Sequence, residues 1–94
     1  MPAIIISQSL FPLGQVVITP NALATVPKPV ILDGLQRHAA GDWGQLPAED
    51  AELNNVSLVE GGRLFSAYGE GPQRFWIITE SDRSATTILM PEDY

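Results

Sequence analysis

The sequence has no cysteine, a single histidine and only five lysine and arginine residues in a chain of 94. The lack of cysteine excludes disulfides and thiolate metal sites, so packing alone must hold the fold together. With one histidine, any metal site would have to be rich in carboxylates. Five cations are too few for the basic stripe that follows a nucleic-acid backbone, so direct binding to duplex nucleic acid is disfavoured.

Long hydrophobic runs are lacking as well. No stretch approaches the roughly 18 apolar residues that a membrane-spanning helix needs. The apolar run Ala3–Ile6 is too short for the hydrophobic part of a signal peptide, and no basic residues precede it. We therefore expect a cytoplasmic protein that has no membrane partner.

The composition is that of one folded domain covering residues 1–94. Hydrophobic residues make up 45% of the chain and charged residues 17%, which excludes the polar, highly charged composition of disordered proteins. The net charge is −6 and the isoelectric point is about 4.4. This acidity either keeps the protein soluble, or forms a surface that imitates nucleic acid or meets a basic partner.

Proline and glycine divide the first half of the chain into short elements. Gln15–Ile18 is β-branched and lies between Gly14 and Pro20, which predicts a strand. Ala3–Ile6 is a candidate for a second strand paired with it. Thr19 followed by Pro20 is typical of a helix start and predicts a single turn over residues 21–24.

Two helices are expected next. The first starts at Pro29 and runs to about Ala40, with Ile31, Leu35 and His38 on one face. The second follows Pro47 and ends at Gly61-Gly62, and we expect Leu53 and Val56 to form its buried stripe. Its early carboxylates, Glu49, Asp50 and Glu52, match the positive end of the helix dipole. Between the helices, Trp43 should anchor a structured connector.

The last third predicts three strands over Arg63–Tyr68, Arg74–Glu80 and Ser84–Met90. The breaks between them are short, which favours an antiparallel meander. Apolar residues alternate onto both faces of the middle strand, so we expect it to be central and covered on both sides, with Phe75 and Trp76 buried. The expected fold class is α+β: a C-terminal three-strand antiparallel meander plus one or more N-terminal strands, packed against two short helices.

No P-loop, dinucleotide-binding, zinc-protease or paired-cysteine motif is present, and the sequence predicts neither a cofactor nor a metal site. His38 is either a partly buried helix histidine bonded to the connector or a general acid or base. The strands of the meander gather an unusual share of the chain's polar groups. Those of interest are Arg63, Ser66, Thr79, Arg83 and Thr86. They are either ordinary strand and turn residues or a phosphate-binding set.

Four stretches, LFPLGQVVITPNAL, RHAAGDWG, GRLFSAY and WIITESDRSATTILMPEDY, make the chain similar to a small family of bacterial proteins encoded on plasmids and integrative elements. The similarity covers nearly the whole chain. Members are labelled hypothetical or plasmid-related, and some "type I restriction endonuclease subunit M", although no methyltransferase motif is present here. The resemblance implies residence on mobile DNA.

The expected order of two helices and a meander more loosely resembles the RelE-type and barnase-like ribonucleases. By residue type, that resemblance implies catalytic roles for His38, Arg63, Ser66, Thr79 and Thr86, with Arg83 as an alternative cation, although such nucleases are basic and this chain is acidic. Two functions follow as hypotheses. The first is a non-enzymatic accessory protein of a mobile element that binds another protein, such as a host-defence component. The alternative is a metal-independent ribonuclease, with RNA as its partner.

Overall fold

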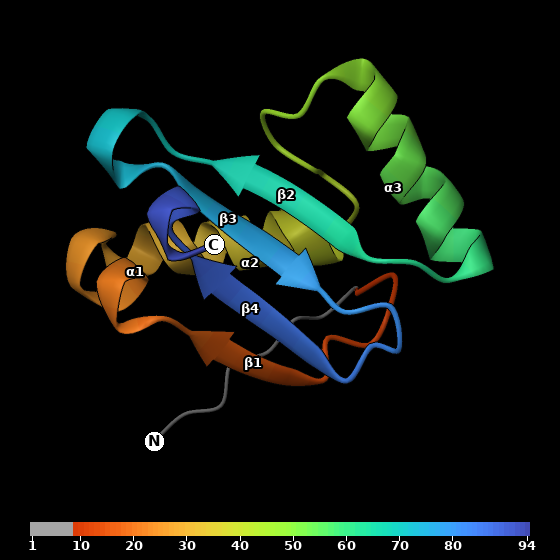
Figure 1. The fold of residues 1–94 in the computed structure, drawn as a ribbon, viewed down its shortest axis with the longest axis horizontal. Coiled ribbons are helices and arrows are strands. Elements are labelled where there is room, and N and C mark those ends of the chain that lie inside the picture. The colour runs from red at the N-terminus through yellow and green to blue at the C-terminus, as the bar shows by residue number, and fades with distance from the viewer. Residues whose placement is uncertain (1–8) are drawn as a thin grey trace.

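A computed structural model describes residues 9–94, in which three helices accompany one four-stranded sheet (Figure 1). The helices are α1 (Pro20–Thr25), α2 (Lys28–Ala39) and α3 (Ala48–Glu60). The strands are β1 (Gln15–Ile18), β2 (Leu64–Tyr68), β3 (Phe75–Thr79) and β4 (Ala85–Leu89), and two short 3-10 helices cover Gly71–Gln73 and Pro91–Asp93. The expected α+β class is confirmed, and every predicted strand and helix in this part of the chain is present.

The sheet has the strand order β1-β4-β3-β2. Strands β2, β3 and β4 form the predicted antiparallel meander, and each lies within one residue of its predicted bounds. The first strand, β1, pairs with β4 in parallel, so the two ends of the chain meet in the sheet. The second N-terminal strand predicted over Ala3–Ile6 lies outside the described residues.

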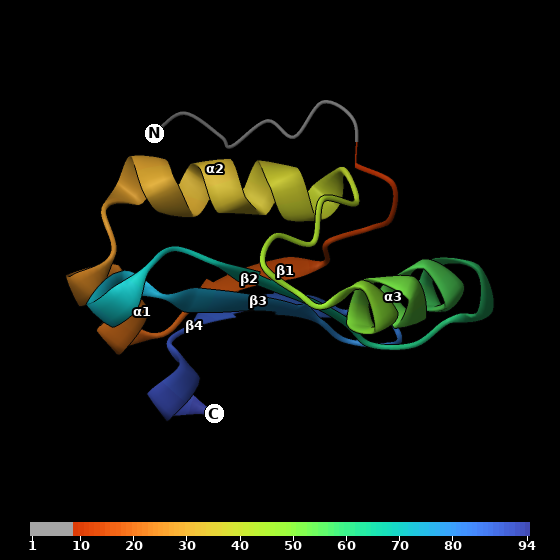
Figure 2. The ribbon, with the colours of Figure 1, turned by 90° about the horizontal axis from the view of Figure 1, so that it is seen from above.

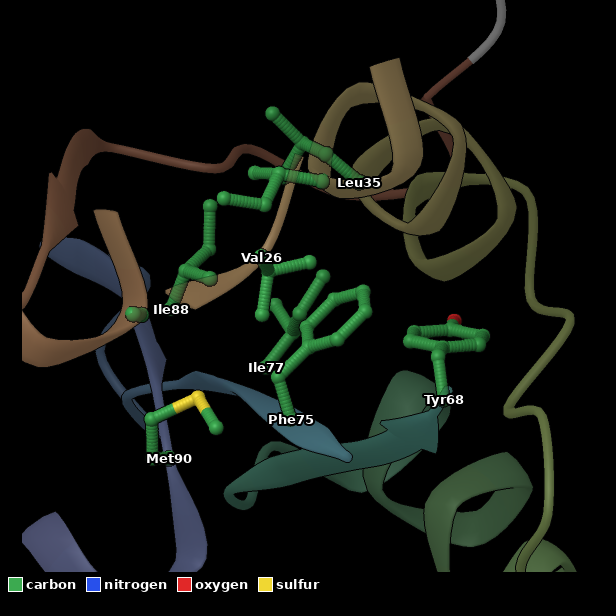
Figure 3. Packing of buried hydrophobic residues seen from close by; sticks show 9 residues of the cluster. Val26, Leu35, Tyr68, Phe75, Ile77, Ile88 and Met90 are labelled. Atoms are coloured by element: carbon green, nitrogen blue, oxygen red, sulfur yellow. The ribbon is translucent and has the colours of Figure 1, made fainter. Parts of the chain in front are cut away.

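The helix α2 covers one face of the sheet (Figure 2). Its residues Ile31, Leu35 and His38 are at most 2% exposed, which confirms the predicted buried face. Gly34 allows a close approach, because a Cβ atom there would lie 2.9 Å from the Phe75 ring. Figure 3 shows the core that results, in which α2, the strands and the segment after α1 all contribute side chains. The members of this core are Ala22, Val26, Ile31, Leu35, Tyr68, Phe75, Ile77, Ile88 and Met90.

The helix α3 does not pack on a face of the sheet. Figure 2 shows it beside β2, level with the strands. The prediction that Leu53 and Val56 form its buried stripe is wrong, since these side chains are 64% and 43% exposed. The buried residue of α3 is Asn54, and Ala51 and Leu58 are partly buried against a second small core. A helix at a sheet edge meets backbone polar groups, which an amide side chain can pair with and a leucine cannot.

The face of the sheet opposite α2 is only partly covered. Ile78 is buried there and Trp76 is partly buried, so the predicted cover on this face is complete at Ile78 and incomplete at Trp76. Its neighbours are Phe65, whose ring centroid lies 4.9 Å away, and Tyr94, at 5.8 Å. Within residues 9–94 no α-helix lies across this face, and the short 3-10 helix Pro91–Asp93 is the helical element on that side (Figure 2), so the tryptophan keeps contact with solvent. No helix within residues 9–94 is long and apolar enough to cross a membrane.

Candidate protein-interaction surface

Four side chains from the helix and the meander meet beneath α2, and we call them the His38 cluster: His38, Ser66, Thr79 and Thr86. All four are fully buried. His38 Nδ1 lies 2.5 Å from Ser66 Oγ, and His38 Nε2 lies 2.9 Å from Thr79 Oγ1. Thr79 Oγ1 is in turn 2.8 Å from Thr86 Oγ1. The sequence had grouped these residues by type, and the fold brings them together.

The hydrogen bonds of the His38 cluster run in one direction. Thr86 Oγ1 donates to the carbonyl of Leu13 at 2.7 Å, because a carbonyl can only accept. Thr79 must therefore donate a hydrogen bond to Thr86 and accept one from His38 Nε2–H, which leaves Nδ1 to accept a hydrogen bond from Ser66. His38 is thus the neutral Nε2–H tautomer. The cluster links α2, the three strands of the meander and the N-terminal loop.

Burial lowers the pKa of His38 from its ordinary 6.5 to about 3. The rings of Phe11 and Trp43 lie against the imidazole, with centroids 5.4 and 5.6 Å away. Trp43 itself is 5% exposed, and its Nε1 donates to Asn55 Oδ1 at 3.0 Å, so the connector is the Trp-anchored loop that we predicted. A neutral imidazole sealed behind two aromatic rings holds structure together and cannot exchange protons with a bound substrate.

The two arginines of the candidate set lie apart from the His38 cluster. Arg63 is half-exposed, forms an ion pair with Glu80 at 3.3 Å and donates to Tyr94 Oη at 2.9 Å. Arg83 stands in the turn before β4 with a φ of 60°. Its guanidinium donates to the carbonyls of Gly62, Glu80, Ser81 and Ser57. Both arginines are therefore bonded to groups of the chain itself, and neither has a hydrogen bond to the His38 cluster. Within residues 9–94, no three His, Asp or Glu side chains come together as a metal site would require.

Two sets of hydrogen bonds occupy the outward backbone groups of β2. The Asn54 side chain donates to the Phe65 carbonyl at 2.7 Å and accepts from the Phe65 amide at 3.2 Å. Two residues along, the Ala67 amide donates to the Trp43 carbonyl and the Ala67 carbonyl accepts from the Gln45 amide. Gly44 permits this contact, because a Cβ atom there would lie 2.0 Å from the Ala67 oxygen. The chain thus satisfies this edge with its own groups.

The closing of the β2 edge leaves the far side of α3 facing solvent, and we call it the α3 outer surface. It consists of Leu53, Val56 and Val59 together with Glu49, Glu52 and Glu60. Val56 lies at the centre of this surface. Leu53 and Val59 are three residues away from it on either side, and Glu52 and Glu60 are four residues away. Leu53 is 64% exposed and Val59 87% exposed. The surface therefore combines apolar side chains with carboxylates.

The carboxylates of α3 have no cationic partner among the described residues. The ion pairs that residues 9–94 form are Arg37–Asp42 and Arg63–Glu80, neither of which involves α3. Asp50 adds a fourth carboxylate to the helix, which contains no lysine or arginine. An apolar stripe flanked by unpaired negative charge is suited to a partner that supplies an apolar groove and basic residues.

Sequence reasoning missed Asn54, which decides how α3 is oriented. A signal was present, because Asn54 and Asn55 are adjacent in a helix interior, where asparagine is a poor helix former and is usually kept for a hydrogen bond. No family model, curated protein or solved structure matches this chain. The resemblance to mobile-element proteins therefore stays an expectation.

Proposed function

We propose that this protein is an accessory protein of a bacterial mobile element that acts by binding another protein through the α3 outer surface. The observation that carries the proposal is the exposure of Leu53, Val56 and Val59 on a helix whose polar residue is turned inward. An amphipathic helix normally buries its apolar side against its own sheet. In α3, Ala51 and Leu58 pack against the chain's own core, whereas Leu53, Val56 and Val59 remain available to another molecule.

The energetics favour this use of the surface. Covering apolar surface contributes about 25 cal/mol for each Å² removed from water, and helix-in-groove complexes draw on such i, i+3 and i+4 anchors. The helix is already fixed in place by Asn54 and by the bond between Asn55 and Trp43. A preformed helix loses little conformational entropy when it binds, which leaves more of the contact energy for affinity.

The charge of the surface defines the partner. Glu49, Glu52 and Glu60 would repel an acidic protein and attract one whose groove is bordered by lysine or arginine. Proteins that handle nucleic acid carry such basic surfaces. A host-defence component that acts on DNA, or the element's own replication or maintenance protein, has this chemistry.

The ribonuclease alternative receives no comparable support. Metal-free RNA cleavage needs a base at the 2′-hydroxyl and a cation on the phosphate, both within reach of the substrate. His38 is 0% exposed, and Arg63 is paired with Glu80. We therefore retain protein binding as the proposed function.

A pull-down from host cells with matched variants tests the proposal. Val56→Lys places a cation in the centre of the α3 outer surface, and Val30→Lys on α2 is its control, because the two valines are 43% and 41% exposed. We expect wild type and Val30→Lys to retain the same basic protein and Val56→Lys to lose it. Purified partner should bind Glu52→Lys at least tenfold more weakly, and added salt should weaken the wild-type complex. Equal retention by Val56→Lys, or no retained protein, would refute the proposal.

A further inference from the structure

The outer strand β1 forms the second edge of the sheet, and it differs from the β2 edge in what lies beside it (Figure 1). The amides of Gln15 and Thr19 donate to the carbonyls of Ser84 and Ile88 on the β4 side. Because backbone groups alternate along a strand, Val17 also points toward β4, and the amides and carbonyls of Val16 and Ile18 point outward. The part of the chain that the structure describes provides no partner for these outward groups.

Natural proteins usually protect such an edge with charges, proline, a bulge or a covering element. The QVVI sequence of β1 contains no charge or proline, and no element within residues 9–94 covers its outer side. Val16 and Val17 are 39% and 41% exposed. The protein is acidic, but all eleven of its acidic residues follow position 32 in the sequence, so none lies in β1 or before it.

The distribution of charge identifies the occupant. Two copies of a protein with a net charge of −6 repel each other unless they meet where carboxylates are scarce. Residues 9–32 contain no carboxylate, and Lys28 is their one charged residue. The carboxylate that reaches the end of β1 is Asp93, which accepts hydrogen bonds from Thr19, Asn21 and the Met90 amide. The β1 edge is thus suited to a second copy of this chain.

We propose that β1 pairs antiparallel with β1 of a second copy around a two-fold axis at Val17, which joins the two sheets into one. In this register, Val16 of each copy lies opposite Ile18 of the other. Those are the residues with outward backbone groups, so the two copies exchange four hydrogen bonds. Val17 of one copy lies opposite Val17 of the other. Its side chain is on the sheet face away from α2, because it pairs with Thr87, whereas the adjacent Thr86 points toward α2 in the His38 cluster.

Apolar side chains beside β1 extend the contact. A hollow of about 380 Å³ adjoins the strand and is lined by Val16, Leu35 and loop residues of the range 9–14. Gly34 of α2 approaches Tyr68 of β2, at one edge of the sheet. Leu32, which is 38% exposed, lies on the other flank of α2 and therefore toward β1. Stable dimers bury about 1,200–2,000 Å² in total, which a four-residue strand pair reaches only with such flanking contacts.

The inference is independent of the proposed function, because it concerns a different edge and has a different readout. Sedimentation of wild type over increasing concentration should show a species of twice the 10.2 kDa of one chain. Val17→Lys and Val17→Glu should each be monomeric, because like charges then meet at the axis. Mixed together, these two variants should restore the dimer. Val56→Lys on α3 is the control and should dimerise as wild type does.

Amide hydrogen exchange on the wild type provides a second measurement that needs no variant. In the dimer, the amides of Val16 and Ile18 should become protected as the concentration rises, and the amide of Val17 should be protected throughout. A wild type that stays monomeric at millimolar concentration would overturn the proposal and leave this edge to the strand predicted over Ala3–Ile6. Dimerisation that survives Val17→Lys but is lost in Val56→Lys would overturn it as well, and would place the contact on α3.

Discussion

The β1 and β2 edges are both short strands of mostly apolar residues, but only β2 has its outward backbone groups bonded within residues 9–94. At β2, Asn54 and the residues around Trp43 occupy the outward amides and carbonyls of Phe65 and Ala67. At β1, no described residue does the same for Val16. The difference shows that the composition of a strand does not decide whether its edge is available. That depends on whether another part of the chain carries polar groups at the right distance.

The largest expected effect is the loss of stability at low pH, which arises from His38 and its bond to Ser66 of β2. His38, on the β2 side, has a pKa of about 3 when folded and 6.5 when unfolded, so the unfolded chain binds more protons between these values. Stability should therefore fall as the pH drops from 6.5 to 3, by up to about 4–5 kcal/mol from this group alone. Urea unfolding at a series of pH values measures it. His38→Leu should be less stable at pH 7 but should have a flatter pH dependence; an unchanged slope would contradict this.

Removal of the Trp43 side chain should be the most damaging single truncation at the closed edge. Trp43 is 5% exposed and packs against Phe11 and the His38 imidazole. Trp43→Ala should reduce the free energy of unfolding by about 3–5 kcal/mol, as large aromatic truncations in cores do. Denaturant unfolding measures the change, and a loss below about 1 kcal/mol would show that the loop is not an anchor.

Asn54→Ala should reopen the β2 edge. It leaves the Phe65 amide and carbonyl without their partners, which should cost about 2–3 kcal/mol. Asn55→Ala is the natural comparison, since it removes one hydrogen bond from the Trp43 indole and should cost about 1 kcal/mol. Equal losses in the two variants would mean that the edge groups find water instead.

The smallest effect is expected for proline at β1. Val16→Pro removes an amide that points away from the sheet, so it should change stability by less than about 1 kcal/mol at concentrations where the chain is monomeric. The matched change on the other edge, Ala67→Pro, removes a donor that is bonded to the Trp43 carbonyl and should cost clearly more. Thermal unfolding of both variants would decide, and the reverse order would contradict the assignment of the open edge.

The predictable part of the fold was the part governed by local sequence. Strands β2, β3 and β4 were predicted to within one residue, because runs of aromatic, aliphatic and β-branched residues with short breaks between them leave few alternatives. The bounds of α2 and its buried face followed from the spacing of its apolar residues. For α3 the same reasoning located the helix but assigned the wrong face. Periodicity reports which residues share a side, and it does not report whether that side meets an apolar sheet face or a polar sheet edge.

The candidate site shows the same division. Residue type singled out His38, Ser66 and Thr79, and helical spacing placed His38 on the buried face of α2. The complete burial of the histidine behind Phe11 and Trp43 was not predicted, because those two rings come from separate loops. The arginines were selected by residue type. Arg83 bonds to the nearby carbonyls of Glu80 and Ser81, whereas Arg63 pairs with Glu80 and Tyr94, which are 17 and 31 positions away.

Local propensity and hydrophobic spacing along this chain determine its elements, its α+β class and its acidity, since each depends on neighbouring residues or on composition alone. Which edge of the sheet is closed, which side of α3 faces solvent and whether His38 can meet a substrate depend on contacts between distant positions. Thr86 bonds to Leu13 across 73 positions of sequence, and Asn54 reaches the backbone of Phe65 only after α3 has turned back along β2. Such contacts form when the chain packs, because packing brings a buried polar group to the partner that it must have.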